Sequence, residues 1–359
     1  MKILIGADVV PHKGDNEEYF IKGNAEKILG KELKYIVDSA DLRIYNLEVP
    51  LTDIEKPIKK AGPNLIAKPE TVAGYKAIGA DILTIANNHV MDQDTDGFIN
   101  TLKVLDKAGI KYIGGGLTKE QACAPYIANA DGKKVVFYAV CENEFSRIED
   151  YGVGTNGFDP LYTPDEIYDL KKDADYVVVL YHGGKEEYRY PSPMLRKRCR
   201  KMVEKGADLI VCTHTHCVGC EEDYLDGKIV YGIGNFVFLK YIRDCWVNGM
   251  LVSLDISKDG VKVDYVPVER VDETSIKLSN DKSILGDFYS RSEEIKKDGF
   301  VEQNFLEYAR SYDWYKKFYT PQFETDFGVT HLVNYYECEP HVEIITCIAK
   351  DKMGLPRKK

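Results

Sequence analysis

The sequence lacks an excess of positive charge and has no long apolar segment. Its 359 residues include 48 Lys and Arg against 58 Asp and Glu, which gives a net charge of −10. A protein whose main task is binding nucleic acid or an anionic membrane needs a basic surface, so both classes are disfavoured. No segment approaches the ~18 consecutive apolar residues of a transmembrane helix. We therefore expect neither a nucleic acid nor a membrane as partner.

The sequence also lacks the signs of secretion. The first apolar run is short and meets the charged residue Asp8 before it reaches the length of a secretory signal. The 9 cysteines are an odd number, and they are scattered through apolar segments without the spacing of a disulfide framework. We therefore predict reduced thiols and a cytoplasmic location.

What the sequence does have is a recurring order of structural signals. Four times, a predicted helix is followed by Ala-Asp, then by a short apolar run, then by a polar residue. The aspartates of this arrangement are Asp41, Asp81, Asp175 and Asp208. Short apolar runs after helices are typical of buried strands in a sheet that helices cover. The pattern predicts a layered α/β fold with central β-sheets flanked by helices.

The pattern changes after Arg270. Up to that point the strand and helix signals continue, and segments 228–238 and 249–268 alternate in a way that predicts antiparallel strands completing the sheet. We therefore assign residues 1–270 to one domain.

Residues 271–359 form a different region, rich in Tyr, Lys, Glu and Asp, with a helix expected around 290–318. We expect a mainly helical C-terminal extension that packs on the core and forms a wall of the cleft. Aromatic residues at helical spacing are expected to face that core, or else a second copy of the chain in a homo-oligomer. These are Tyr308, Tyr312, Tyr315 and Tyr319.

Polar residues follow the predicted strands where each strand ends. Strand ends converge at one edge of a layered α/β fold, so residues about 200 positions apart are expected in one cleft. Any one of them also has a structural interpretation, as a helix cap or a hydrogen-bonded core residue. Together they offer the oxygen and imidazole donors of a divalent metal site. The set is Asp8, Glu48, Asn88, His89, His182, His214 and His216.

The pair His214 and His216 is the most specific local signal. Alternate residues of a straight strand point to opposite sides, so both imidazoles cannot reach one metal from an extended segment. A turn just past the strand end lets them serve two neighbouring metals.

Seven ordered pieces of residues 1–240 carry a resemblance to a known family. They are Gly6-Ala7-Asp8, Asn46 to Thr52, Ala86 to His89 with Asp92 and Gly97, Gly114-Gly115-Gly116, His182-Gly183-Gly184 with Glu187 and Tyr188, Gly206 to His216, and Gly234 to Phe238. In these pieces the chain resembles the bacterial CapA family of poly-γ-glutamate capsule biosynthesis proteins. The resemblance implies the fold of calcineurin-like metallophosphoesterases.

The resemblance also implies one or two divalent metal ions (Mn, Zn or Fe) and a role for each residue. Asp8 and Glu48 would be shared between two metals, and His89 would assist catalysis without binding metal. The remaining ligands would be Asn88, His182 and His214 at the second metal and His216 at the first. Substrate contacts are also expected from Asn46 and Asn235. Lys185 and Arg189 follow His182 in a cationic stretch and could hold a carboxylate or phosphate, with an exposed helix face as the alternative interpretation of that stretch.

One motif departs from the metallophosphoesterase pattern. That pattern has Asp-x-His at its first motif, whereas Asp8 is followed by Val9 and Val10. The first metal then keeps Asp8, Glu48 and His216, with His12 as a further candidate and a single-metal protein as the alternative.

Three functions fit these expectations. The first is a metal-dependent hydrolase acting on poly-γ-glutamate or a related anionic polymer or small-molecule substrate. The second is a phosphoesterase. The third is a non-catalytic accessory protein of capsular poly-γ-glutamate biosynthesis.

Overall fold

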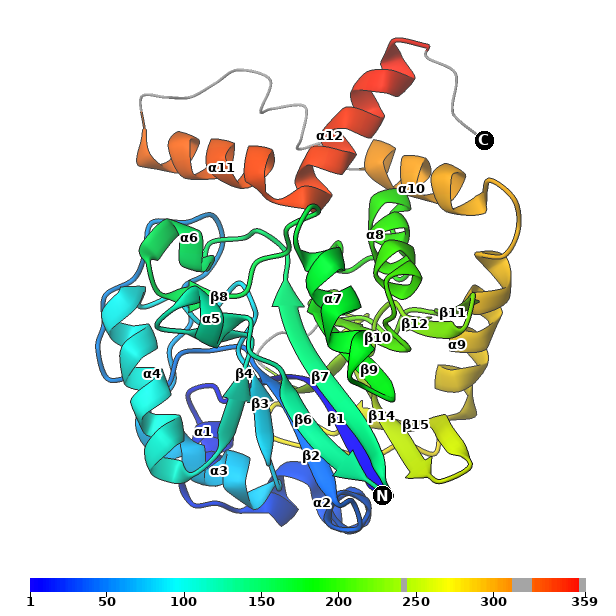
Figure 1. Ribbon diagram of the computed structural model, residues 1–359. Coiled ribbons are helices and arrows are strands. Elements are labelled where there is room, and N and C mark those ends of the chain that lie inside the picture. Colours follow the sequence, from blue (N-terminus) through cyan, green and yellow to red (C-terminus); the bar gives the residue numbers. More distant parts are fainter. Residues whose placement is uncertain (240–243, 312–324, 355–359) are drawn as a thin grey trace.

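Two β-sheets lie face to face at the centre of the computed structural model, which describes residues 1–239, 244–311 and 325–354 (Figure 1). The first sheet contains, in order, β16 (Ile276–Leu278), β15 (Gly260–Arg270), β14 (Asn248–Ser257), β1 (Lys2–Val10), β2 (Leu42–Leu47), β3 (Ile82–Thr84) and β4 (Lys111–Ile113), with β13 (Asn235–Phe238) also paired to β1. The second contains β11 (Glu221–Tyr224), β12 (Gly227–Val230), β10 (Leu209–Thr213), β9 (Tyr176–His182), β7 (Lys133–Cys141) and β6 (Tyr126–Ala130). A short pair, β5 (Gly115–Gly116) and β8 (Gly154–Thr155), lies apart from both.

Strand β1 shows why its sequence is apolar at nearly every position between Lys2 and Asp8. Ile3 and Ile5 face the second sheet, whereas Leu4 and Val9 face the helices on the other side. Successive side chains of a strand point to opposite faces, so a strand covered on both sides needs apolar residues at nearly every position. Each fully buried side chain of this size contributes roughly 1.5–3 kcal/mol.

Helices cover the outer face of each sheet. The first sheet is covered by α1 (Asp15–Ile21), α2 (Ala25–Asp38), α3 (Val72–Ala77) and α4 (Asp94–Ala108). The second is covered by α7 (Thr163–Lys172) and α8 (Pro193–Glu204). The remaining short helices of the core are η1 (Pro69–Thr71), α5 (Lys119–Ala122) and α6 (Ile148–Tyr151). The predicted layered α/β fold is confirmed.

The recurring Ala-Asp arrangement has a structural reason. Each of its four aspartates accepts a hydrogen bond from a backbone N–H at the start of a neighbouring strand. The bonds are Lys2 N to Asp41 (2.6 Å), Arg43 N to Asp81 (2.8 Å), Lys134 N to Asp175 (2.7 Å) and Val177 N to Asp208 (2.7 Å). The carboxylate thus ties the incoming strand to its neighbour at the edge opposite the cleft, because strand starts lie away from strand ends.

The expected antiparallel strands are confirmed for segment 249–268 and only in part for segment 228–238, where β12 pairs antiparallel with β11. β14 and β15 pair antiparallel from Asn248 opposite Glu269 to Ser257 opposite Gly260. In segment 228–238, however, β12 is parallel to β10, and β13 is parallel to β1. The chain crosses from the second sheet to the first between these two strands. β13 therefore adds to the carboxyl end of β1, where Asn235 lies opposite Asp8.

The expected helix around 290–318 is two helices. α9 (Lys282–Glu294) and α10 (Phe300–Ser311) are separated by a turn in which Gly299 has φ +70°, a left-handed conformation that favours glycine. Residues 312–318 lie outside the described residues, as do the predicted core positions Tyr312, Tyr315 and Tyr319. Tyr308 is half-buried, and its ring centroid lies 4.3 Å from that of Tyr188 on the core.

Two further helices, α11 (Asp326–Glu337) and α12 (Glu339–Lys352), lie beyond the carboxyl ends of the second sheet (Figure 1). They dock on the core through an apolar cluster, in which Ile344 and Ile348 of α12 pack with Tyr188 and Phe305, and through polar contacts. Glu339 accepts hydrogen bonds from the backbone and side-chain nitrogens of Asn143, and Glu343 accepts from the backbone nitrogen of Met194 at 2.8 Å. Among the helices that the structure describes, none is long and apolar enough to span a membrane.

Candidate metal centre

Residues at the ends of strands from both sheets meet in one buried cluster. Asp8 lies near the end of β1, Glu48 directly follows β2, and His182 ends β9. Asn88 follows β3, and His214 follows β10. His182 connects the two sheets, because its Nε2 lies 3.3 Å from Glu48 Oε1 and 3.1 Å from Asn88 Oδ1. The structure thus brings the predicted donors together in the predicted place.

The donors form two groups that share one carboxylate. Glu48, His182 and His214 form one group, and Asp8, Glu48 and His216 form the other. Within each group the donor atoms lie within 4.8 Å of one another. Glu48 is therefore the member common to both groups, whereas Asp8, which the resemblance also makes a shared ligand, belongs to one. His12 belongs to neither group in the part of the chain described.

The carboxylates of the cluster have buried oxygens without hydrogen bonds. Both Oε1 and Oε2 of Glu48, and Oδ2 of Asp8, make no hydrogen bond with the described residues. Both side chains are fully buried. Burying a carboxylate without compensation costs several kcal/mol, so such atoms require a partner that carries positive charge. Carboxylate oxygens beside imidazoles fit a divalent cation, and these residues could therefore hold one.

The two histidines after β10 reach the cluster through unusual backbone conformations. His214 has φ +78° and His216 has φ +55°, both in the left-handed region. Residues other than glycine adopt this region at a cost, and they do so most often at functional sites. The turn lets each imidazole enter a different donor group, as expected for a turn past the strand end.

The pKa values of these two imidazoles are shifted in opposite directions. Burial lowers the pKa of His216, but the carboxylate of Asp8, whose Oδ2 lies 3.4 Å from His216 Nδ1, and the charge of Glu48 outweigh burial and raise the pKa to about 10. Burial and the neighbouring His182 hold the pKa of His214 well below its usual value. In the protein without metal, His216 is thus the cation that accompanies Asp8, and His214 is neutral.

Asn46 and Asn235 lie behind the donors. Asn46 Nδ2 donates to Asp8 Oδ1 at 2.8 Å, and its Oδ1 accepts from Thr84 at 2.9 Å. Asn235 Oδ1 lies 2.8 Å from His216 Nδ1 and is its acceptor. Both asparagines are buried, and neither lines the cavity next to the cluster. This placement favours orienting the donors over contacting a substrate.

His89 lies beside the cluster but in neither donor group. Its Nδ1 is 2.6 Å from Asp92 Oδ2, and Asp92 also forms an ion pair with Lys60. Although burial raises the pKa of Asp92, Lys60 and His89 outweigh it and lower that pKa, so the carboxylate is ionised. A histidine held at one nitrogen by a carboxylate has its other nitrogen available for proton transfer.

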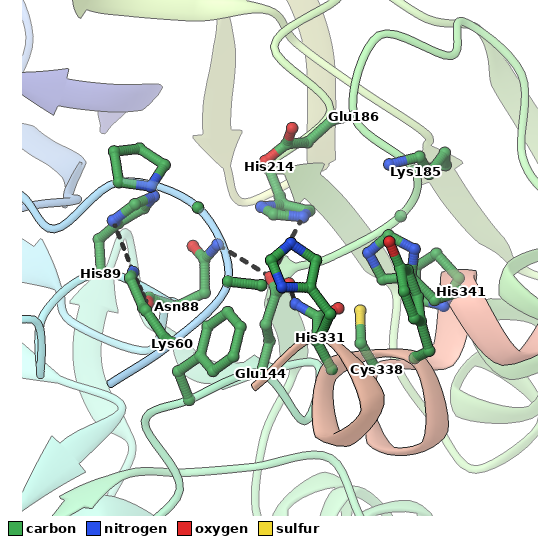
Figure 2. A pocket seen from close by; sticks show the side chains of 18 residues that line it. Lys60, Asn88, His89, Glu144, Lys185, Glu186, His214, His331, Cys338 and His341 are labelled. Atoms are coloured by element: carbon green, nitrogen blue, oxygen red, sulfur yellow. Dashed lines mark hydrogen bonds and ion pairs between the residues drawn. The ribbon is translucent and has the colours of Figure 1, made fainter. Parts of the chain in front are cut away.

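A cavity of about 230 Å³ opens next to the cluster (Figure 2). Asn88, His89 and His214 form one side of it, and Lys185 also lines it. Arg189 does not line it, because its guanidinium donates to the backbone oxygen of Val218 at 3.2 Å.

Sequence reasoning missed several residues of this cavity. They are Lys60, Glu144, Glu186, His331, Asn334, Cys338 and His341. Glu144 follows a strand, β7, so the strand-end rule could have found it. It escaped because β7 follows strand β6 and not a helix, which breaks the recurring arrangement. The last four lie in the C-terminal extension, which is expected to form a wall of the cleft, but nothing in the sequence singles out these residues.

The fold and the cluster define a class: layered α/β proteins with a candidate metal centre where the ends of two facing sheets meet. A model of the family described as bacterial capsule synthesis protein PGA_cap matches residues 2–240. The chain therefore belongs to this capsule synthesis family, as the sequence motifs indicated.

Two curated relatives and one solved structure are similar to the chain. It is 31% identical over 254 residues to the capsule biosynthesis protein CapA of Bacillus anthracis, covering 64% of this chain and 62% of the relative. It is 28% identical over 265 residues to the PGA biosynthesis protein CapA of Bacillus subtilis, covering 68% and 66%. The matches thus span less than two thirds of either relative. A hypothetical protein from Thermus thermophilus has a TM-score of 0.47 and 16% identity, covering 75% of this chain and all of that one.

Proposed function

We propose that the chain is a metal-dependent hydrolase that acts on poly-γ-glutamate or a related anionic γ-glutamyl polymer. The observation that supports this most is the shared carboxylate of Glu48, which lies between two groups of imidazole and carboxylate donors. Both of its oxygens are buried and make no hydrogen bond with the described residues. A fold gains no stability from such an arrangement in the absence of a cation. The presence of this arrangement favours a site that holds one or two divalent ions, Mn, Zn or Fe.

Each of the two donor groups would hold one ion. Glu48, His182 and His214, with Asn88 beside them, would hold one ion, and Asp8, Glu48 and His216 the other. Divalent ions held there would supply Lewis-acid chemistry: they would lower the pKa of water and polarise a carbonyl or phosphoryl oxygen. Asn235 fixes the ring of His216 through its Nδ1, which leaves Nε2 for the metal.

His89 is the residue we assign to proton transfer. Asp92 holds its Nδ1, and the ring lines the cavity. Its Nε2 is thus placed to donate a proton to the nitrogen that leaves when an amide is cleaved. Lys185, on the same cavity, is placed to attract the α-carboxylate of a γ-linked glutamate residue. The relatives' printed names, which concern capsule and PGA biosynthesis, support this choice of substrate.

The test compares hydrolysis of γ-glutamyl polymers and of phosphoesters by metal-loaded protein, with Glu48→Gln as the inactive control. We expect polymer cleavage that depends on added metal and is absent from the variant. Cleavage of phosphoesters alone would replace the proposal by a phosphoesterase. Hydrolysis of neither substrate by protein that contains metal would overturn it and leave the accessory role in capsule synthesis.

A further inference from the structure

The cavity has a second wall, and it comes from helices outside the region that the family model matches. His331, Asn334 and Cys338 lie on or at the end of α11, and His341 lies in the first turn of α12. Figure 2 shows His331, Cys338 and His341 on the side of the cavity that the helices form. The match ends at residue 240. This wall is thus a feature of this chain that family membership does not explain.

Three side chains of types that can bind a metal meet where this wall contacts the loop after β7. The carboxylate of Glu144, the thiol of Cys338 and the imidazole of His341 offer donor atoms that all lie within 4.8 Å of one another. They come from three places in the chain: the loop after β7, the junction of α11 and α12, and the first turn of α12. We propose that Glu144, Cys338 and His341 form a separate divalent-metal site, with the donor set that suits Zn²⁺.

A fourth side chain points to a ligand at the same place. Asn334 is 6% exposed, and its Nδ2 donates to Glu144 Oε1 at 3.0 Å. Its Oδ1 is buried and makes no hydrogen bond with the described residues. A buried amide oxygen without a donor requires a partner, and a cation held by the adjacent Glu144 supplies one. Sulfur, nitrogen and oxygen donors together are typical of zinc sites, where water often completes the coordination.

The protonation of the site is compatible with metal binding. Burial and the nearby positive charge of Lys185 lower the pKa of His341 to about 3, so the imidazole is neutral and able to ligate. Burial raises the pKa of the Cys338 thiol, so an ion must displace its proton, and binding weakens as the pH falls. Because Lys185 opposes a cation, we expect lower affinity here than at the candidate metal centre.

The site is close to the metal centre but distinct from it. Glu144 Oε2 accepts from Asn88 Nδ2 at 2.9 Å and lies 3.8 Å from His214 Nε2. The carboxylate of Glu144 therefore lies between the proposed site and the candidate metal centre. An ion at the new site would fasten α11 and α12 to the rim of the cleft. This role does not depend on the reaction proposed for the centre.

Cobalt provides the test, because a thiolate bound to Co²⁺ gives a charge-transfer absorption in the near ultraviolet that imidazole and carboxylate ligands do not. The donors of the metal centre include no cysteine. The full chain, freed of metal, is titrated with Co²⁺ alone, alongside Cys338→Ser and His341→Ala. Cys347→Ser is the matched control, since Cys347 lies on α12 but outside the three donors. Near-ultraviolet circular dichroism checks that each variant folds.

We expect the thiolate absorption in the wild type and in Cys347→Ser. The Cys338→Ser variant should lose the absorption and should bind about one equivalent of metal less than the wild type. Glu48→Gln should keep the absorption while losing metal from the centre. A wild type without the absorption, or a Cys338→Ser protein that retains it, would overturn the proposal. Metal bound in the absence of the absorption would still leave the candidate centre intact, so the two proposals fail separately.

Discussion

The two walls of the cavity differ in how the chain builds them. The wall of the metal centre consists of strand ends, each directly preceded by the apolar run that forms its strand. The opposite wall consists of helix surfaces on α11 and α12. They are held by polar contacts such as Asn334 to Glu144 and by an apolar cluster that joins Ile344 of α12 to Tyr188 of the core. A strand end has its place fixed by the sheet, whereas a helix surface has its place fixed only by docking. The first wall is therefore set by local sequence and the second by tertiary contacts.

Removing the second wall should give the largest effect. A chain that ends at Arg270 loses the buried side chains Phe288 and Phe305, which pack on the core from α9 and α10. It uncovers an apolar surface, so we expect aggregation or a much lower melting temperature. A truncated chain that stays monomeric, melts at the wild-type temperature and keeps its activity would show that the walls do not depend on each other.

Removing the shared carboxylate should abolish function while leaving the fold. Glu48→Gln takes the negative charge from both donor groups at once, so we expect the metal of the candidate centre and the hydrolytic activity to disappear together, while metal at the Cys338 site remains. Elemental analysis and thermal melting measure the two effects. Because a buried carboxylate without hydrogen bonds is also removed, the metal-free variant should melt no lower than metal-free wild type.

His89→Ala separates proton transfer from metal binding on the first wall. Since His89 belongs to neither donor group, the variant should keep its metal. Turnover should fall by roughly 10²–10⁴-fold, the usual contribution of a general acid or base. His214→Ala is the comparison, and it should lose metal and activity together. Equal metal loss in both variants would refute the role of His89.

The smallest effect is expected for a residue behind the donors. Asn235→Ala removes the acceptor that holds Nδ1 of His216. Loss of such a partner weakens metal affinity by roughly 10–100-fold. Metal titration followed by calorimetry measures the change. Unchanged affinity, combined with a raised KM for polymer, would instead support the substrate contact that sequence reasoning assigned to Asn235.

Much of the first wall could be predicted because its metal-donor residues stand in the sequence directly at or after the apolar runs that form the strands. Asp8, Glu48, His182 and His214 each end or follow an apolar run, and parallel strands place such ends together. A turn at His214 and His216 could be predicted only because both imidazoles need it to reach two neighbouring metals. Nothing in the local sequence enforces the left-handed backbone conformation. The pairing of β13 with β1 was missed because alternation in a segment does not reveal to which sheet, or in which direction, it will add.

A wall formed by the C-terminal extension is expected from the sequence, but the residues of that second wall could not be predicted, for a physical reason. The segment that holds Cys338 and His341 has the pattern of an ordinary amphipathic helix, and its polar residues resemble those of a solvated surface. Their meeting with Glu144 depends on how α12 docks through Glu339 and Glu343 on the core. The expected division at residue 270 describes the change in composition and remains a prediction as a domain boundary.

The most direct test of the central claim is anomalous X-ray scattering from crystals of the full chain grown with Mn²⁺ or Zn²⁺. The strand ends are proposed to hold metal through Glu48, so an anomalous peak should lie between Glu48, His182 and His214. Where a second ion binds, another peak should lie between Asp8, Glu48 and His216. Crystals of fully folded protein with saturating metal and no anomalous peak within bonding distance of Glu48 would contradict the account.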